Sequence, residues 1–226
     1  MDDKYKYTYE RTSDYCYLNS DVLINKLNIK NDKELFEAER EFVMYRAAML
    51  IDSPQKGNFD FEHLKAIHKH LFQDIYDWAG KPRNCNIAKT NLFCLAQYID
   101  NYSSDVFNNI TSNNYYITLS YENKIIALAE LFADINALHP FREGNGRTQR
   151  EFINGLAKIN GLKLDFTKVK EKEMIIASSE SANGNMQKLF DMFQKIAIPI
   201  SKEEQLKAID NYIDDKTVVT MLKNLI

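Results

Sequence analysis

Residues 139 to 150 read HPFREGNGRTQR and combine a histidine, a carboxylate and two glycines, followed by two arginines three positions apart. Glycines permit a tight turn and let an anion approach the backbone amides closely. If a helix begins at this turn, its first N–H groups have no partner inside the helix, and together with the helix dipole they attract negative charge. The stretch is therefore predicted to cradle phosphate groups on Gly144, Asn145 and Gly146.

The charged residues around this turn fit the same ligand. Arg147 and Arg150 are three residues apart and share one helix face, and each guanidinium can bind two phosphate oxygens. Glu143 would repel a polyphosphate unless a cation lay between them, and Mg²⁺ held by one carboxylate and phosphate oxygens meets this need. His139 can act as a general base near neutral pH, so we expect it to take a proton from an incoming hydroxyl.

Each of these features also occurs without a catalytic role. A histidine between a helix and a loop is more often structural than catalytic, Gly-Asn-Gly is an ordinary turn, and arginines three apart commonly form a solvated helix face. The prediction of a nucleotide site therefore depends on their combination in one short stretch.

The composition is that of an ordinary globular protein. Of the 226 residues, 45% are hydrophobic and 27% charged, and 13 Tyr and 13 Phe can fill a core. The net charge of −3 leaves no broad basic field for a nucleic-acid backbone, so we expect no direct nucleic-acid partner. We find no run of 18 apolar residues and no signal-like N-terminal stretch, so we also expect no membrane association.

The three cysteines, Cys16, Cys85 and Cys94, suit neither a disulfide framework nor a zinc site, because their number is odd and no CxxC spacing occurs. Free thiols fit a reducing compartment, and we expect a cytoplasmic protein.

Apolar residues recur at helical spacing along most of the chain and predict a mainly α fold. One predicted helix ends just before the motif, and the next, 143–160, begins inside it. The helical period is lost at GKPRNCNIAKTNLF (80–93), which is predicted to form a short β-hairpin flap beside the active-site loop. We predict a catalytic domain over residues 1–199 and a C-terminal helical tail over 200–226. The other predicted helices cover about 31–51, 95–110, 122–138, 168–182 and 186–198, and one more carries Leu64, Ile67, Leu71 and Ile75 on one face.

The motif resembles the signature of the Fic family, His-x-Phe-x-Asp/Glu-Gly-Asn-Gly-Arg-x-x-Arg, at all eight specified positions. Three further segments are similar to parts of the family: YCYLNSDVLINKLNI (15–29), WAGKPRNCNIAK (78–89) and IIASSESANGNMQKLFDMF (175–193). The resemblance covers about residues 15–199 and implies a Fic-type helical bundle with a flap next to the active-site loop.

The resemblance also implies an activity. Most family members with the complete motif transfer AMP from ATP to a Tyr, Thr or Ser hydroxyl of a target protein and release pyrophosphate. By this likeness His139 is the base, Glu143 holds Mg²⁺ and Phe141 anchors the loop. The phosphates would be bound by Gly144, Asn145 and Gly146, with Arg147 on the β-phosphate and Arg150 on the γ-phosphate.

The flap would contribute target binding. By the same likeness, the segment around Ile87, Ala88 and Lys89 pairs with the backbone of the target as an added strand. This mode of recognition reads the main chain more than side chains, so it does not reveal the target.

Many family members inhibit themselves through a helix with the pattern Ser/Thr-x-x-x-Glu-Gly/Asn, whose Glu pairs with the second arginine. The match in this chain is Thr118 to Glu122-Asn123, but Glu122 begins the helix that ends at His139, about 25 Å away. We therefore favour a toxin restrained by a separate small antitoxin that supplies the helix, with a diverged internal brake as the alternative. In bacterial members of that class DNA gyrase and topoisomerase IV are targets, which makes them candidate targets by likeness alone.

Two other functions remain open from the sequence. One is a different transfer, of UMP or GMP or of a phosphoryl group as in Doc-type proteins, although those depart from the Gly-Asn-Gly-Arg-x-x-Arg part that is intact here. The other is a non-catalytic nucleotide-binding interaction module, against which His139 and Glu143 both speak.

Overall fold

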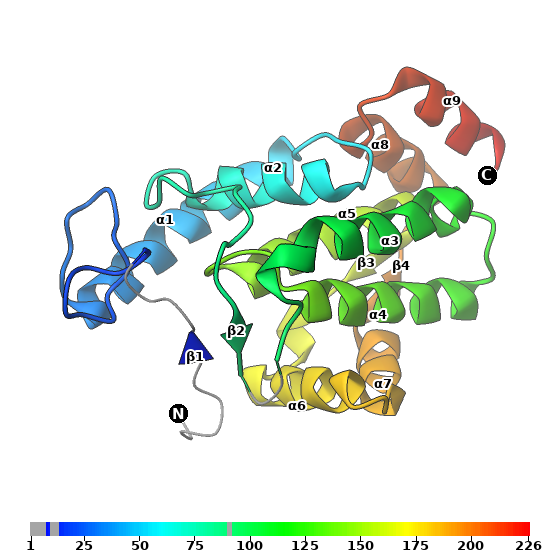
Figure 1. The fold of residues 1–226 in the computed structure, drawn as a ribbon. Helices are drawn as coiled ribbons and strands as arrows, with labels where there is room; N and C mark the ends of the chain where they lie inside the picture. The colour runs from blue at the N-terminus through cyan, green and yellow to red at the C-terminus, as the bar shows by residue number, and fades with distance from the viewer. Residues whose placement is uncertain (1–7, 10–13, 90–91) are drawn as a thin grey trace.

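The computed structural model describes residues 8–9, 14–89 and 92–226, and most of them are helical, which confirms the predicted class (Figure 1). The helices are α1 (Asp32–Asp52), α2 (Phe61–Phe72), α3 (Ile99–Ser112), α4 (Tyr121–Leu138), α5 (Asn145–Ile159), α6 (Glu171–Ala182), α7 (Gln187–Ile196), α8 (Lys202–Tyr212) and α9 (Lys216–Asn224). Short 3₁₀ turns are η2 (Ala96–Tyr98), η3 (Asn114–Tyr116) and η4 (Phe166–Lys168). The strands are β1 (Thr8–Tyr9), β2 (Ile87–Ala88), β3 (Leu162–Leu164) and β4 (Ala197–Pro199).

Helices α4 and α5 form the centre of the molecule. The two helices contact each other. In addition, α2 and α8 pack on α5, whereas α3 and α7 pack on α4. Leu128 and Leu138 of α4 and Phe152 and Leu156 of α5 are fully buried, so the two helices are fixed by apolar packing on several sides. The loop that joins them therefore starts and ends at rigid points.

Three parts of the fold differ from the expectation. Helix α3 continues to Ser112, and the chain then turns through three consecutive left-handed residues from Asn114 to Tyr116. The pair β3–β4 was not predicted: Leu162 lies opposite Pro199 and Leu164 opposite Ala197, in antiparallel register. The helix expected over 186–198 ends at Ile196, because the chain leaves the helix there to form β4.

The predicted tail forms α8 and α9. Gln205 of α8 donates from Nε2 to the Ile159 carbonyl at 2.9 Å, and the Tyr212 ring is stacked with Phe59 at 6.3 Å. A backbone bridge joins Gly57 to Ile213. The division of the chain at residue 199 stays a prediction, and α8 is packed closely against α5.

The flap contains β2 and a return arm. An antiparallel bridge between Ala88 and Leu92 fits the predicted hairpin, while its turn at residues 90–91 lies outside the described residues. The second partner of β2 is β1, with Thr8 opposite Ala88 and Tyr9 opposite Ile87. This pairing with the N-terminal segment was not predicted.

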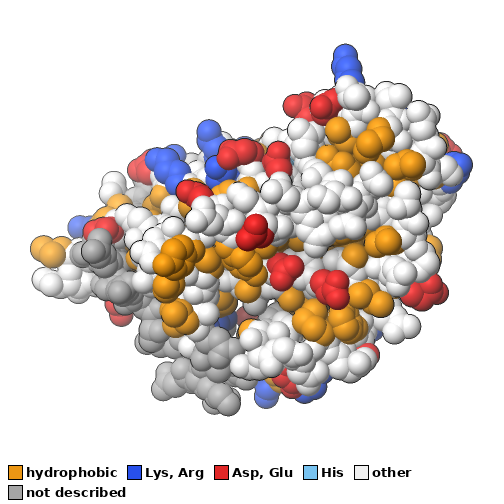
Figure 2. Space-filling model, turned by 45° about the vertical axis from the view of Figure 1, so that its right-hand side comes forward, with side chains coloured by type: hydrophobic (Ala, Val, Ile, Leu, Met, Phe, Trp, Pro, Cys, Tyr) orange, Lys and Arg blue, Asp and Glu red, His pale blue; other side chains and the backbone are white. Residues whose placement is uncertain are grey.

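The surface mixes charged and apolar side chains. In the view of Figure 2, acidic and basic side chains are interspersed with several separate hydrophobic patches. Helix α1 exposes Phe36, Met44 and Tyr45 to more than 60% each. Within the described part of the chain, no helix has both the length and the hydropathy needed to cross a membrane.

Candidate active site

The motif forms the loop between α4 and α5 and the first turn of α5. His139 ends α4 in the left-handed conformation, with φ of 44°, and its N–H donates to the Ile135 carbonyl at 3.0 Å. Gly144, also left-handed at φ of 82°, directly precedes α5. The helix therefore begins inside the motif, as predicted, and the amides of its first turn are directed toward the loop.

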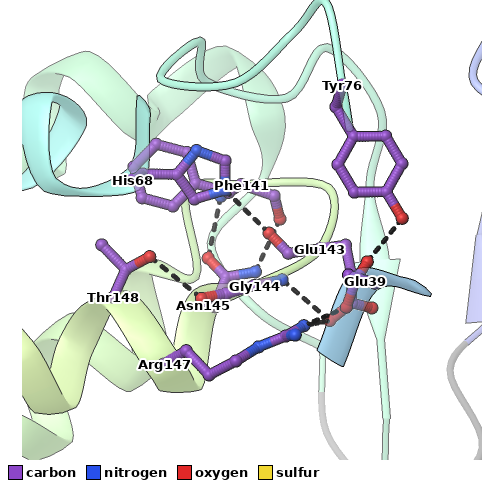
Figure 3. Close-up of polar contacts among 9 residues, drawn as sticks. All are labelled: Glu39, His68, Tyr76, Phe141, Glu143, Gly144, Asn145, Arg147 and Thr148. Carbon is purple, nitrogen blue, oxygen red and sulfur yellow. Dashed lines mark hydrogen bonds and ion pairs between the residues drawn. The ribbon is translucent and has the colours of Figure 1, made fainter. Parts of the chain in front are cut away.

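Side chains of the loop and of α5 fix the turn (Figure 3). The Asn145 amide accepts from Phe141 N at 2.8 Å and donates to Phe141 O at 2.7 Å. Thr148 Oγ1 donates to the Gly144 carbonyl at 3.0 Å. Since its side chain holds the turn, Asn145 can offer its backbone N–H to a phosphate.

His68 of α2 contacts the loop and holds it in place. Its Nδ1 accepts from Gly80 N at 2.8 Å, so Nε2 carries the proton and donates to the Glu143 carbonyl at 3.0 Å. The ring is stacked on Phe141 at 3.8 Å. Burial lowers the pKa of His68 to about 3, so a neutral imidazole holds the loop at any physiological pH.

A cavity of about 230 Å³ opens beside the start of α5. It is bounded by the flap, by α4 and α5 and by α6, which faces them from the other side. Its lining comprises Lys89, Phe93, Phe132, Asn136, His139, Gly146, Gln149, Arg150, Glu171, Met174, Ile175, Ser178, Ser179 and Ala182.

His139 is 5% exposed and lies against Phe93 of the flap, with ring centroids 3.8 Å apart and the rings nearly parallel. Burial, and then the charges of Arg83 and Lys89, lower the pKa of His139 to about 3. The imidazole is therefore neutral and able to accept a proton, and Phe93 fixes its orientation at the cavity wall.

Arg83 is buried, and within the described residues its guanidinium donates to backbone carbonyl groups. It donates from Nε to His139 O at 2.8 Å and from Nη1 to Cys85 O at 2.7 Å, and Nη2 reaches Cys94 O. Its N–H donates to Pro140 O at 2.8 Å. One guanidinium thus joins the C-terminal end of α4 to both arms of the flap.

Arg150 lies on the face of α5 that lines the cavity. Its contact among the described residues is from Nη1 to Met174 Sδ at 3.7 Å, and no carboxylate of the described chain forms an ion pair with it. Burial and the neighbouring Arg147 lower the pKa of Arg150, although the group stays cationic. A β-carbon on Gly146 would lie 3.4 Å from Arg150 Nη1, within ordinary van der Waals contact of the guanidinium.

Arg147 is held by two carboxylates (Figure 3). Its Nη2 lies 2.6 Å from Glu39 Oε1 and 3.2 Å from Glu143 Oε1, and its guanidinium covers the Phe72 ring at 4.7 Å. Tyr76 donates its hydroxyl hydrogen to Glu39 Oε2 at 2.5 Å. Burial works to lower the pKa of Arg147, but the two carboxylates outweigh it and raise the pKa.

Glu143 occupies the mouth of the predicted phosphate nest. Its Oε1 accepts from its neighbour Gly144 N at 2.8 Å as well as from Arg147. The carboxylate therefore stands where an anionic ligand would meet the first free amide of the turn. A phosphate that binds these amides must compete with Glu143 or reach it through a cation.

Comparison with known proteins identifies the fold. The sequence model of the Fic/DOC family matches residues 58–157, which include the whole motif. A probable protein adenylyltransferase of Sinorhizobium fredii is 36% identical over 173 residues, 76% of this chain and 88% of the relative. A probable protein adenylyltransferase Fic of Escherichia coli is 31% identical over 90% of this chain and 100% of its own. The chain belongs to the Fic/DOC family.

A solved Fic-type structure extends this likeness to three dimensions. The crystal structure of BepC, a VirB-translocated effector of Bartonella tribocorum with bound AMPPNP, has a TM-score of 0.78. It is 27% identical and covers 85% of this chain and 100% of its own. These likenesses confirm the predicted family and fold and are consistent with the predicted enzyme class, a nucleotidyltransferase.

Four of the ten predicted Fic site residues line one cavity. His139, Gly146 and Arg150 line one cavity, and Lys89 of the flap lines it as well. Burial lowers the pKa of Lys89, while Glu143 and Glu171 oppose this change. The roles of these residues, and those of Glu143, Gly144, Asn145, Arg147, Ile87 and Ala88, stay predictions.

Four residues that support the Fic motif were missed: Glu39, His68, Tyr76 and Arg83. Glu39 lies about a hundred positions before the motif, and no spacing rule connects the two. Arg83 is within the segment 78–89 that resembled the family, and its place in that segment was the available signal.

The match to the inhibitory pattern also has a defined position. Glu122 is in the first turn of α4, and His139 caps the other end of this 18-residue helix. The two therefore lie at opposite ends of α4, in agreement with the expectation that Glu122 does not reach Arg150.

Proposed function

We propose that this chain is a protein adenylyltransferase that moves AMP from ATP to a Tyr, Thr or Ser hydroxyl of a target protein. The observation that carries the proposal is one cavity lined by a neutral, oriented imidazole and by an arginine that lacks a carboxylate partner among the described residues, His139 and Arg150. The names of the relatives and the AMPPNP bound to BepC support it.

The phosphates would bind the first turn of α5. Gly146 is exposed, so a phosphate can approach its N–H, and Arg150, which forms no ion pair with a carboxylate of the described residues, can bind the γ-phosphate. Arg147 has no described partner for Nε or Nη1, and these groups suit the β-phosphate. Together these contacts would place the α-phosphorus on the side of the cavity where His139 lies.

The catalytic step would be an in-line displacement at the α-phosphorus. The hydroxyl oxygen of the target forms a bond to the α-phosphorus, the bond from that phosphorus to the oxygen bridging to the β-phosphate breaks, and pyrophosphate leaves. His139 accepts the hydroxyl proton. Its pKa is low in the absence of ligand, and a bound triphosphate would raise the pKa because negative charge nearby favours imidazolium.

Glu143 would hold Mg²⁺. Its carboxylate lies at the mouth of the nest with its side chain one-third exposed, and a single carboxylate suits a cation that takes its other ligands from phosphates and water. No group of three or more metal-binding side chains occurs in the described part of the chain, which fits a metal brought with the nucleotide. Bound there, Mg²⁺ would stabilise charge on the leaving pyrophosphate.

Restraint by a separate partner is supported by a second groove, which is lined by both arginines. This groove of about 250 Å³ has apolar walls from Val43 and Ala47 of α1 and reaches Arg147 and Arg150. A partner helix with apolar residues and one carboxylate would fill the groove and neutralise Arg150. A toxin restrained by a small antitoxin in the cytoplasm is the form of regulation we favour, with gyrase or topoisomerase IV as candidate targets by likeness alone.

The position of the label decides among the possible transfers. Purified protein is incubated with a bacterial lysate and Mg-ATP labelled on the α- or the γ-phosphate. Label from the α-phosphate on protein supports AMP transfer, label from the γ-phosphate supports a kinase, and label from neither supports a binding module. UTP and GTP labelled on the α-phosphate test the base preference, and His139→Ala should retain nucleotide binding without transfer.

A further inference from the structure

Strand β2 of the flap lies between two other segments. On one edge Ala88 forms an antiparallel bridge with Leu92 of the return arm. Since a strand has only two edges, one edge remains for pairing with any further strand. β1 occupies this edge, with Thr8 opposite Ala88 and Tyr9 opposite Ile87 (Figure 1).

The flap is fixed beside the cavity. Ile87 is 1% exposed, and its carbonyl accepts from Phe93 N at 3.1 Å. Phe93 is stacked on His139, and Cys94 N donates to the Ala137 carbonyl of α4 at 2.9 Å. These contacts hold β2 in place for a strand that pairs with it. β2 ends one residue before Lys89, which lines the cavity.

We propose that β1 is an intramolecular stand-in for the target strand, which a target must displace before its hydroxyl reaches the cavity. The partner that fits this edge is an extended segment antiparallel to β2 and bonded mainly through its backbone. The inference rests on the proposed function in one respect, that the displacing partner is the acceptor protein.

The connection between β1 and the flap is short. Tyr15 is six residues after Tyr9, and its hydroxyl accepts from Asn84 N at 3.2 Å, three residues before β2. The Tyr15 ring also meets Trp78 edge-on at 5.9 Å. A strand on so short a tether has an effective concentration on the order of millimolar at the flap, so it competes with targets that bind the edge weakly.

The segment also has the composition of an acceptor. Residues 5–12 read YKYTYERT, and five of these eight residues carry a hydroxyl of the kind that the proposed reaction modifies. The segment thus matches a target in residue type as well as in backbone pairing. A synthetic peptide of this sequence is therefore a suitable probe for the edge.

Hydrogen exchange tests whether β1 occupies the edge of β2, and it does not depend on AMP transfer. The double variant T8P/Y9P removes both backbone donors of β1, and T12P places one proline in the same segment outside β1. The Ile87 carbonyl bonds the return arm, so the backbone groups of Ala88 are the ones in β2 that face β1. We expect the amide of Ala88 to exchange at least about tenfold faster in T8P/Y9P than in the wild type or T12P. The peptide YKYTYERT should restore the protection of this amide in T8P/Y9P. Equal exchange in all three proteins, or no protection by the peptide, would overturn the proposal.

Transfer to the same peptide provides the second readout. With ATP labelled on the α-phosphate, T8P/Y9P should label the peptide about tenfold faster than the wild type, because its edge is free. If hydrogen exchange in β2 increases as expected but none of the proteins transfers AMP to any acceptor, the proposed function is wrong. The proposal that β1 occupies the edge of β2 is then still supported. If the wild type labels lysate proteins but T8P/Y9P shows no gain on the peptide, the stand-in fails and the function stands.

Discussion

The carboxylate of Glu39 lies 2.6 Å from Nη2 of Arg147 and joins α1 to the first turn of α5. Glu39 precedes the part of the chain that matches the family, residues 58–157. Helix α1 is itself fixed, because Arg46 forms two hydrogen bonds of 2.6 and 2.7 Å with Asp74 after α2. Helix α1, which lies outside the motif, therefore positions Arg147 of the motif.

Glu39→Gln should lower stability and raise the requirement for Mg²⁺. The buried side of Arg147 loses a charged partner, so we expect the free energy of unfolding to fall by about 1–3 kcal/mol. Arg147 would then pair with Glu143 alone and compete more strongly with the metal. Urea unfolding measures the first effect, and the Mg²⁺ concentration for half-maximal AMP transfer the second.

Glu37→Gln is the matched control, because Glu37 is exposed on the same helix. Tyr76→Phe removes the hydroxyl that bonds Glu39 and should change stability and Mg²⁺ requirement in the same direction but less. An unchanged Mg²⁺ requirement in Glu39→Gln would show that Glu39 has only a structural role.

Gly144→Ala should disrupt the loop. A β-carbon at Gly144 would lie 2.2 Å from Phe72 Cζ, and φ there is +82°. Gly184 shares the left-handed conformation at +87°, but nothing lies within 4 Å of its β-carbon position. Gly184→Ala should therefore cost only the backbone strain, about 1–2 kcal/mol, and retain transfer. Thermal unfolding and AMP transfer of both variants check this, and equal effects would contradict a role for the Phe72 contact.

Stability should fall as the pH is lowered below 6.5. Burial lowers the pKa of both His139 and His68 to about 3, whereas an unfolded histidine titrates near 6.5. Below that pH the unfolded chain takes up protons that the folded chain does not, so each histidine should cost about 2 kcal/mol between pH 7 and pH 5. Urea unfolding of the wild type and His139→Gln at both pH values should show a smaller loss in the variant; equal losses would contradict the low pKa.

Arg83→Lys should reduce AMP transfer more than nucleotide binding. A lysine has three donors on one nitrogen and cannot span His139 O, Cys85 O and Cys94 O in the geometry of a guanidinium. The imidazole and the flap would lose their fixed relation, while Arg150 would still bind phosphate. Calorimetry with a non-hydrolysable ATP analogue and a transfer assay separate the two effects, and a parallel loss of both would point to general unfolding.

The local part of the site could be predicted from the sequence, because its chemistry is contained in twelve consecutive residues. A turn of Gly144 to Gly146 at a helix start and two arginines one turn apart define a phosphate-binding geometry with little help from the rest of the chain. The long apolar periodicities of α4 and α5 likewise predicted the two helices that hold the loop.

The remainder depends on contacts between distant segments. The Glu39–Arg147 pair and the pairing of β1 with β2 each join residues more than 70 positions apart, and sequence spacing does not encode them. The strands β3 and β4 were missed because each has only three residues, too few for an alternating pattern to stand out beside helical neighbours. The side chain of Asn145 holds Phe141 through two hydrogen bonds that the sequence did not reveal, while phosphate binding by Asn145 stays a prediction.

The central claim is that this cavity transfers AMP to protein hydroxyls with His139 as the base. Its most direct test is peptide mass analysis of a bacterial lysate incubated with Mg-ATP and either the wild type or His139→Ala. We predict peptides that carry one AMP on a Tyr, Thr or Ser with the wild type and none with the variant. Equal modification by both proteins, or phosphate in place of AMP, would contradict the account.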